Sequence, residues 1–111
     1  MNQYEIESAF RSRHDCPNVR RGVNLLHALM RSVNEQSDGW AYWTAPSRAA
    51  AKLIALLETA GRVSYGTRGT ITADQLKAAV TPIRRMVTVQ KQRQAKYGNT
   101  FDFDVDAALA E

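Results

Sequence analysis

The chain has 111 residues, a length that fits one domain with a single hydrophobic core. Hydrophobic residues make up 44%, which argues against an intrinsically disordered chain. The one cysteine, Cys16, excludes an internal disulfide, and no stretch approaches the ~20 apolar residues that a membrane span needs. The first residues include Glu5 and Glu7 and lack the apolar core of a signal peptide, so we expect a soluble, cytoplasmic protein.

The net charge of +4 is unevenly distributed along the chain. The last ten residues carry Asp102, Asp104, Asp106 and Glu111 and no basic residue, so the remainder has a balance of +8. Between Asp74 and Asp102 there is no acidic residue, whereas all of the following fall there: Lys77, Arg84, Arg85, Lys91, Arg93 and Lys96. A basic body with an acidic end is typical of proteins with charged partners, and it also describes a plain solvated surface.

In chain order, the first predicted element is a short helix over residues 3–12. Pro17 suits the first turn of the next helix, because its missing N–H has no partner there. That helix is predicted over residues 18–36, since Val19, Val23, Leu26, Met30 and Val33 recur with helical spacing. Another helix is predicted over residues 47–60, with Thr44 or Ser47 as its cap.

Residues 62–72 combine two short β-prone runs with the glycine-flanked turn Gly66–Gly69, a pattern that favours a small hairpin. Thr72 and Gln75 then have the spacing of a capping box, which predicts a helix from Ala73 towards Lys96. Pro82 is expected to break or kink this helix, and Gly98 to end it. Its apolar side includes Leu76, Val80, Ile83, Met86, Val87 and Tyr97, and fades towards the end.

The expected fold is therefore mainly α, a small domain of three to four helices with a possible short β-hairpin around residues 62–72. Residues 1–98 form the helical domain in this interpretation, and residues 99–111 an acidic C-terminal tail or arm. This tail either docks on a neighbouring copy, forms an ordered turn, or folds over the basic residues as a mimic of phosphate.

The basic helix is the first candidate binding site, because a nucleic-acid backbone is bound by several cations along a rigid element. The residues expected to contact phosphates are Arg84, Arg85, Lys91, Arg93, Lys96 and Lys77. Further candidates are Arg20, Arg21 and Arg68. Arg20 and Arg21 lie near the positive end of a helix, where cations are mildly unfavourable, so a separate role is expected for them.

The aromatic residues Trp40, Tyr42 and Trp43 are candidates for a protein interface or for stacking on unpaired bases, and they also suit the gap between two helices. A winged-helix arrangement, with residues 47–60 as recognition helix, is a weaker alternative because that helix is largely apolar. No catalytic residue, metal site or cofactor is expected. His14, Asp15 and Cys16 are adjacent in sequence without the spacing of a known triad or zinc site.

The sequence leaves two functional hypotheses open. The first is a small basic protein that binds DNA or RNA without sequence specificity, alone or as a subunit of a larger phage, mobile-element or nucleoprotein assembly. The second is a protein–protein interaction module, such as an inhibitor or adaptor that binds an acidic surface or forms a homodimer through the Val19–Val33 stripe.

Overall fold

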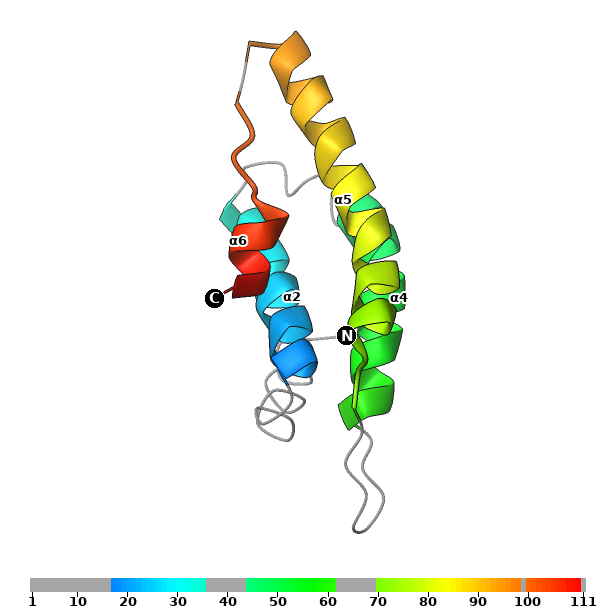
Figure 1. Ribbon diagram of the computed structural model, residues 1–111. Helices are drawn as coiled ribbons and strands as arrows, with labels where there is room; N and C mark the ends of the chain where they lie inside the picture. Colours follow the sequence, from blue (N-terminus) through cyan, green and yellow to red (C-terminus); the bar gives the residue numbers. More distant parts are fainter. Residues whose placement is uncertain (1–16, 36–43, 62–69, 99, 111) are drawn as a thin grey trace.

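The computed structural model describes residues 17–35, 44–61, 70–98 and 100–110, and these residues form helices and no strand. The helices are α2 (Pro17–Glu35), α4 (Thr44–Gly61), α5 (Ala73–Lys96) and α6 (Val105–Ala110), as Figure 1 shows. The prediction of a mainly α fold is confirmed. The predicted helix over residues 3–12 and most of the predicted hairpin, residues 62–69, lie outside the described residues, and residues 70–72 are not in a strand.

Helix α2 lies at the centre of the packing, because it contacts both α4 and α6. It begins at Pro17, where the sequence places the start of a helix. Val19, Val23, Leu26 and Val33 are buried in the chain's own core, and Met30 packs against that core. The stripe that could have served a homodimer is thus used inside the molecule.

The close approach of α2 and α4 depends on Gly22. A Cβ atom at this position would lie 3.2 Å from Leu53 Cδ1 and 3.3 Å from Leu57 Cδ2. Leu53 and Leu57 are both fully buried, so there is little free space to absorb a larger side chain.

Helix α4 begins at Thr44, which is three residues before the predicted start at Ser47. The difference concerns Pro46, which lies in the first turn of the observed helix but before the first residue of the predicted one. The first N–H groups of a helix have no intrahelical partner, so a proline in the first turn costs no hydrogen bond. Pro46 is also among the largest fully buried side chains, which fixes this turn against the core.

Helix α5 begins with the predicted capping box. Gln75 N donates to Thr72 Oγ1 at 3.1 Å, and Thr72 N donates to Gln75 Oε1 at 2.9 Å. Of the two expected effects of Pro82, a break or a kink, the break does not occur, because the helix continues through this residue. Proline removes only the bond to the carbonyl of Ala78, and packing against α4 outweighs this loss along the buried side of the helix.

The buried side of α5 consists of Leu76, Ala79, Val80, Ile83 and Val87. After Val87 no side chain of this helix is buried, which confirms that the apolar stripe fades. Tyr97, predicted on the apolar side, is instead 81% exposed.

Gly98 ends α5 with a φ of +74°, a left-handed conformation that favours glycine. Its N–H donates to the carbonyl of Ala95 at 3.1 Å.

The acidic segment turns back along the molecule and ends in α6, which packs on α2 (Figure 1). Asp104 caps this short helix, because its Oδ1 accepts a hydrogen bond from Ala107 N at 3.1 Å. Val105, Ala108 and Leu109 are buried and belong to the core. The segment predicted as a tail thus contributes apolar contacts as well as charge.

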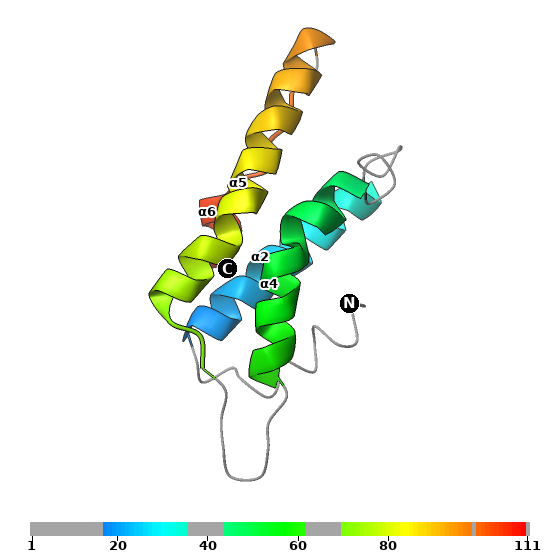
Figure 2. The ribbon, with the colours of Figure 1, turned by 90° about the vertical axis from the view of Figure 1, so that its right-hand side faces the viewer.

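The molecule is elongated, with principal extents of 52 × 25 × 21 Å. Its radius of gyration is 14.4 Å, compared with about 13 Å for an average folded chain of this length. In Figure 2 the C-terminal half of α5 extends beyond the ends of α2 and α4. The part of α5 after Val87, which has no buried side chain, is therefore a helical projection.

Candidate nucleic-acid interface

All six predicted phosphate-contacting residues of α5 are exposed, and helical geometry divides them between two faces. Lys77, Arg84 and Lys91 recur every seven residues, close to two full turns, so they share one stripe. Arg85, Arg93 and Lys96 lie about 100° or more around the helix from Arg84. We refer to Lys77, Arg84 and Lys91 as the inner stripe, and to Arg85, Arg93 and Lys96 as the outer face.

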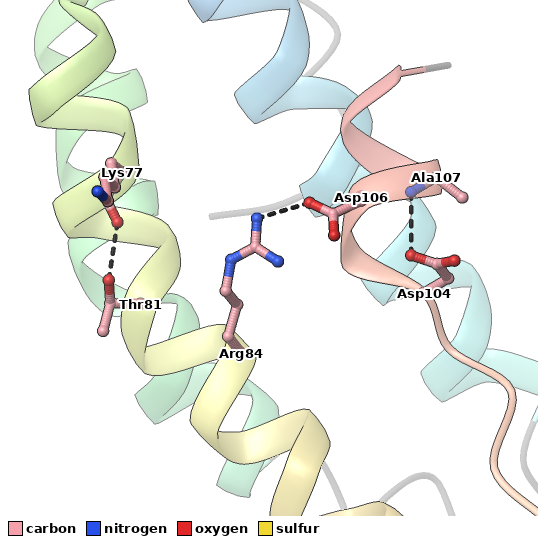
Figure 3. A network of polar contacts seen from close by, with 6 residues as sticks. All are labelled: Lys77, Thr81, Arg84, Asp104, Asp106 and Ala107. Atoms are coloured by element: carbon pink, nitrogen blue, oxygen red, sulfur yellow. Dashed lines mark hydrogen bonds and ion pairs between the residues drawn. The ribbon is translucent and has the colours of Figure 1, made fainter.

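The inner stripe faces α6, and its central residue is paired with an acidic side chain. Arg84 Nη2 donates to Asp106 Oδ1 at 2.7 Å, as Figure 3 shows. The side chains are 48% and 77% exposed, so water and salt screen this ion pair. The predicted phosphate contact Arg84 therefore already has an anionic partner within the chain.

The pair shifts the titration of both groups. The hydrogen bond with Asp106 raises the pKa of Arg84 above its ordinary value, against a smaller opposing effect of burial. The same hydrogen bond lowers the pKa of Asp106, and the positive charges of Arg84 and Arg21 lower it further. Arg21 therefore lies close enough to influence Asp106, although it belongs to another helix.

Arg21 joins the inner stripe around a common cavity. It lines this cavity from α2 together with Lys77 and Arg84 from α5. Arg20, the neighbouring candidate, is exposed and does not line it. The structure thus brings three of the predicted cations together from two helices, and it separates Arg20 from them.

The outer face differs from the inner stripe in its ion pairs. Arg84 of the inner stripe pairs with Asp106, whereas no residue of the outer face forms such a pair with another described residue. Arg93 and Lys96 stand on the projecting half of α5, which also exposes Val89 at 45%. The outer face therefore presents cations with a small apolar surface on a helix that is accessible from several directions.

Other candidates from the sequence are not placed by the structure. Arg68 and the aromatic residues Trp40, Tyr42 and Trp43 lie outside the described residues, as does the His14–Cys16 segment. Within the described ranges, no three His, Cys, Asp or Glu side chains gather as metal ligands would. His27 Nε2 is buried and has no hydrogen-bond partner among the side chains that the structure describes.

One alternative from the sequence, that the acidic segment folds over the basic residues, agrees with the contact between Arg84 and Asp106, but the sequence did not predict which residues pair. A signal was present in the acidic segment, where Asp104 precedes Val105, Ala108 and Leu109. An aspartate followed by apolar residues at helical spacing predicts a capped, docked helix and not a free tail. In the structure, the docked helix places Asp106 Oδ1 at 2.7 Å from Arg84 Nη2.

No protein-family model, curated protein or solved structure matches this chain. None of the helices in the described part has the length and apolar content needed to cross a membrane.

Proposed function

We propose that this chain binds nucleic acid without sequence preference through the outer face of α5. The observation that supports this proposal is the exposure of Arg85, Arg93 and Lys96 on a helix that has no acidic residue after Asp74 and whose end projects from the body. Cations on a rigid rod contact phosphates with little loss of conformational freedom in the backbone.

The dimensions of the outer face suit a phosphate backbone. Residues 85 and 96 are separated by about 16 Å along the helix axis, at ~1.5 Å per residue. A duplex carries one phosphate per ~3.4 Å of its axis on each strand, so this length corresponds to about five phosphates of one strand counted along the axis. Three cations contacting three of them would give a slope near −2.7 when the logarithm of the binding constant is plotted against that of the salt concentration.

The proposal is tested by fluorescence anisotropy with labelled single- and double-stranded DNA and RNA of unrelated sequences, at several salt concentrations. The double variant Arg85→Glu/Arg93→Glu is expected to weaken binding to every sequence at least tenfold and to reduce the salt slope. The matched control is Arg48→Glu/Lys52→Glu, which changes the net charge equally through two exposed residues of α4. Equal losses in both double variants, or no binding at low salt, would contradict the proposal.

A second candidate function is binding to a protein, and one observation favours it. The same projecting segment exposes Val89 and Tyr97, and aromatic side chains are common at protein interfaces. Under this alternative, Val89→Ser/Tyr97→Ser abolishes complex formation or self-association while nucleic-acid binding is absent. Light scattering of the free protein separates a homodimer from a monomer that awaits another partner.

A further inference from the structure

A cavity of about 460 Å³ lies where α2, α5 and α6 meet. It is lined by Arg21 of α2, by Leu109 of α6, and by Leu76, Lys77, Val80 and Arg84 of α5. Sites for small molecules typically have volumes of about 300–1,000 Å³, so this cavity has room for a compact ligand. It lies on the inner stripe, whereas the proposed nucleic-acid contacts lie on the outer face.

The lining separates into an apolar part and a charged part. Leu76, Val80 and Leu109 are each at most 4% exposed and provide apolar walls. Arg21, Lys77 and Arg84 are exposed and provide the polar rim, and no acidic residue is among the lining residues. Apolar walls with a few converging polar groups are the usual composition of a small-molecule site.

The electrostatics of the rim favour an anion. Asn18 Nδ2 donates to the carbonyl of Ile71 at 2.9 Å, which places the N-terminus of α2 beside the start of α5. Helix N-termini carry a partial positive charge, so the two helix ends add to the three cations. Asp106 offsets one of them, because its carboxylate pairs with Arg84. About two positive charges remain at the rim.

The Asp106 contact also shows how an anion fits at this rim. A carboxylate accepts a hydrogen bond from Arg84 at 2.7 Å and interacts with the charge of Arg21. The guanidinium has five N–H donors in all, so a single contact leaves capacity for another acceptor. Asp104 also acts on the charge of Arg84, but it lines a different cavity, beside Phe103 and Ala28.

We propose that this cavity binds a small organic phosphate, in which a phosphomonoester meets Arg21, Lys77 and Arg84 and an apolar or aromatic body contacts Leu76, Val80 and Leu109. A phosphomonoester carries about −1.5 to −2 charges at pH 7, which matches the residual charge of the rim. The apolar walls distinguish this ligand from inorganic phosphate, which has nothing to place against them. This inference does not depend on nucleic-acid binding by the outer face.

The test uses phenyl phosphate as the probe, with inorganic phosphate and phenol as the two halves of the ligand. Binding is measured by calorimetry and by amide chemical shifts in the full chain. Phenyl phosphate is expected to bind at least tenfold more tightly than either half, and to shift the amides of Leu76, Val80 and Leu109. Absence of binding, or equally tight binding of inorganic phosphate, overturns the proposal.

Variants locate the site and separate it from the outer face. Arg21→Gln/Lys77→Gln is expected to weaken phenyl phosphate binding at least tenfold, whereas Arg85→Gln/Arg93→Gln leaves it unchanged. Ala73→Leu, at an exposed position that also lines the cavity, fills the space without altering a rim cation. It is expected to abolish binding while the melting temperature is retained. Unchanged binding in either rim or filling variant overturns the assignment, whatever the result with nucleic acid.

Discussion

Arg84 Nη2 and Asp106 Oδ1 lie 2.7 Å apart and connect α5 to α6 between residues that are 22 positions apart in sequence. The contact joins the acidic segment to the inner stripe at Arg84 (Figure 3). Arg84 and Arg85 are neighbours in sequence, yet only Arg84 has this carboxylate partner. The two residues therefore offer a matched pair for testing what each face does.

Replacing Arg84 is expected to change the titration of Asp106. The pKa of Asp106 lies below its usual value chiefly because Arg84 donates a hydrogen bond to the carboxylate. In Arg84→Gln this pKa should rise towards the ordinary value of about 4. The measurement is a carboxyl ¹³C NMR titration, with Arg85→Gln as the control that should leave Asp106 unchanged. An equal shift in both variants would show that general charge, not this contact, sets the pKa.

The same shift predicts a direction for the pH dependence of stability. The pKa of Asp106 is lower in the folded state than in the unfolded state. The contribution of this residue to the free energy of unfolding is therefore fully present above the unfolded pKa of about 4, and it is lost as the pH falls through the folded pKa. The stability difference between the protein and Arg84→Gln should therefore shrink in acid. Urea unfolding at a series of pH values measures it, and a difference that stays constant into strong acid would refute this origin.

Apolar contacts are expected to hold α6 in place more strongly than the ion pair does. Leu109 is 4% exposed, and truncating a buried leucine to alanine costs about 2–5 kcal/mol. Asp106→Asn affects an exposed group and should destabilise the protein much less. Chemical denaturation of both variants gives the comparison, and hydrogen exchange at the amides of residues 105–110 shows whether α6 undocks. A greater loss of stability in Asp106→Asn than in Leu109→Ala would contradict this prediction.

Removing the proline inside α5 is expected to stabilise the protein. Pro82→Ala restores the N–H that can bond to the carbonyl of Ala78, and alanine is favoured over proline in a helix interior by about 3 kcal/mol. Part of this gain is offset because the ring of Pro82 is half-buried, so we expect about 1–2 kcal/mol in urea unfolding. A destabilised variant would mean that packing of the ring outweighs the missing hydrogen bond.

Enlarging Gly22 is expected to separate α2 from α4. A Cβ atom there already approaches Leu53 and Leu57 within 3.3 Å, so the branched side chain of Gly22→Val cannot fit without movement. Overpacking of this kind costs about 1–3 kcal/mol. Ala55→Val, at an exposed position of α4, is the control and should cost only the difference in helix propensity, about 0.5 kcal/mol. Thermal unfolding followed by circular dichroism compares them, and equal costs would exclude steric contact as the cause.

The helices could be predicted from the sequence because their signals are local. Thr72 and Gln75 are three residues apart, and the apolar stripe of α2 lies within one helix. The continuation of α5 through Pro82 has the opposite origin: the local tendency of proline to break a helix is outweighed by contacts with α4, a distant part of the chain. Local chemistry thus sets where a helix starts, and tertiary packing determines whether it continues.

The grouping of the cations could not be predicted for the same reason. Arg21, Lys77 and Arg84 are brought together by the packing of α2, α5 and α6, and no sequence spacing encodes their convergence. The sequence could predict that Arg84 and Arg85 lie on different faces, because adjacent residues on a helix point about 100° apart. Which of the two faces α6 depended on where the acidic segment docks.

The elongated shape has a practical consequence for determining how many copies associate in solution. A particle with one axis of 52 Å and two of 25 and 21 Å diffuses more slowly than a sphere of equal mass. On a sizing column a single chain would therefore elute early, at a position that a compact protein of larger mass would occupy. Sedimentation or multi-angle scattering, which measures mass independently of friction, is the proper basis for distinguishing one copy from two.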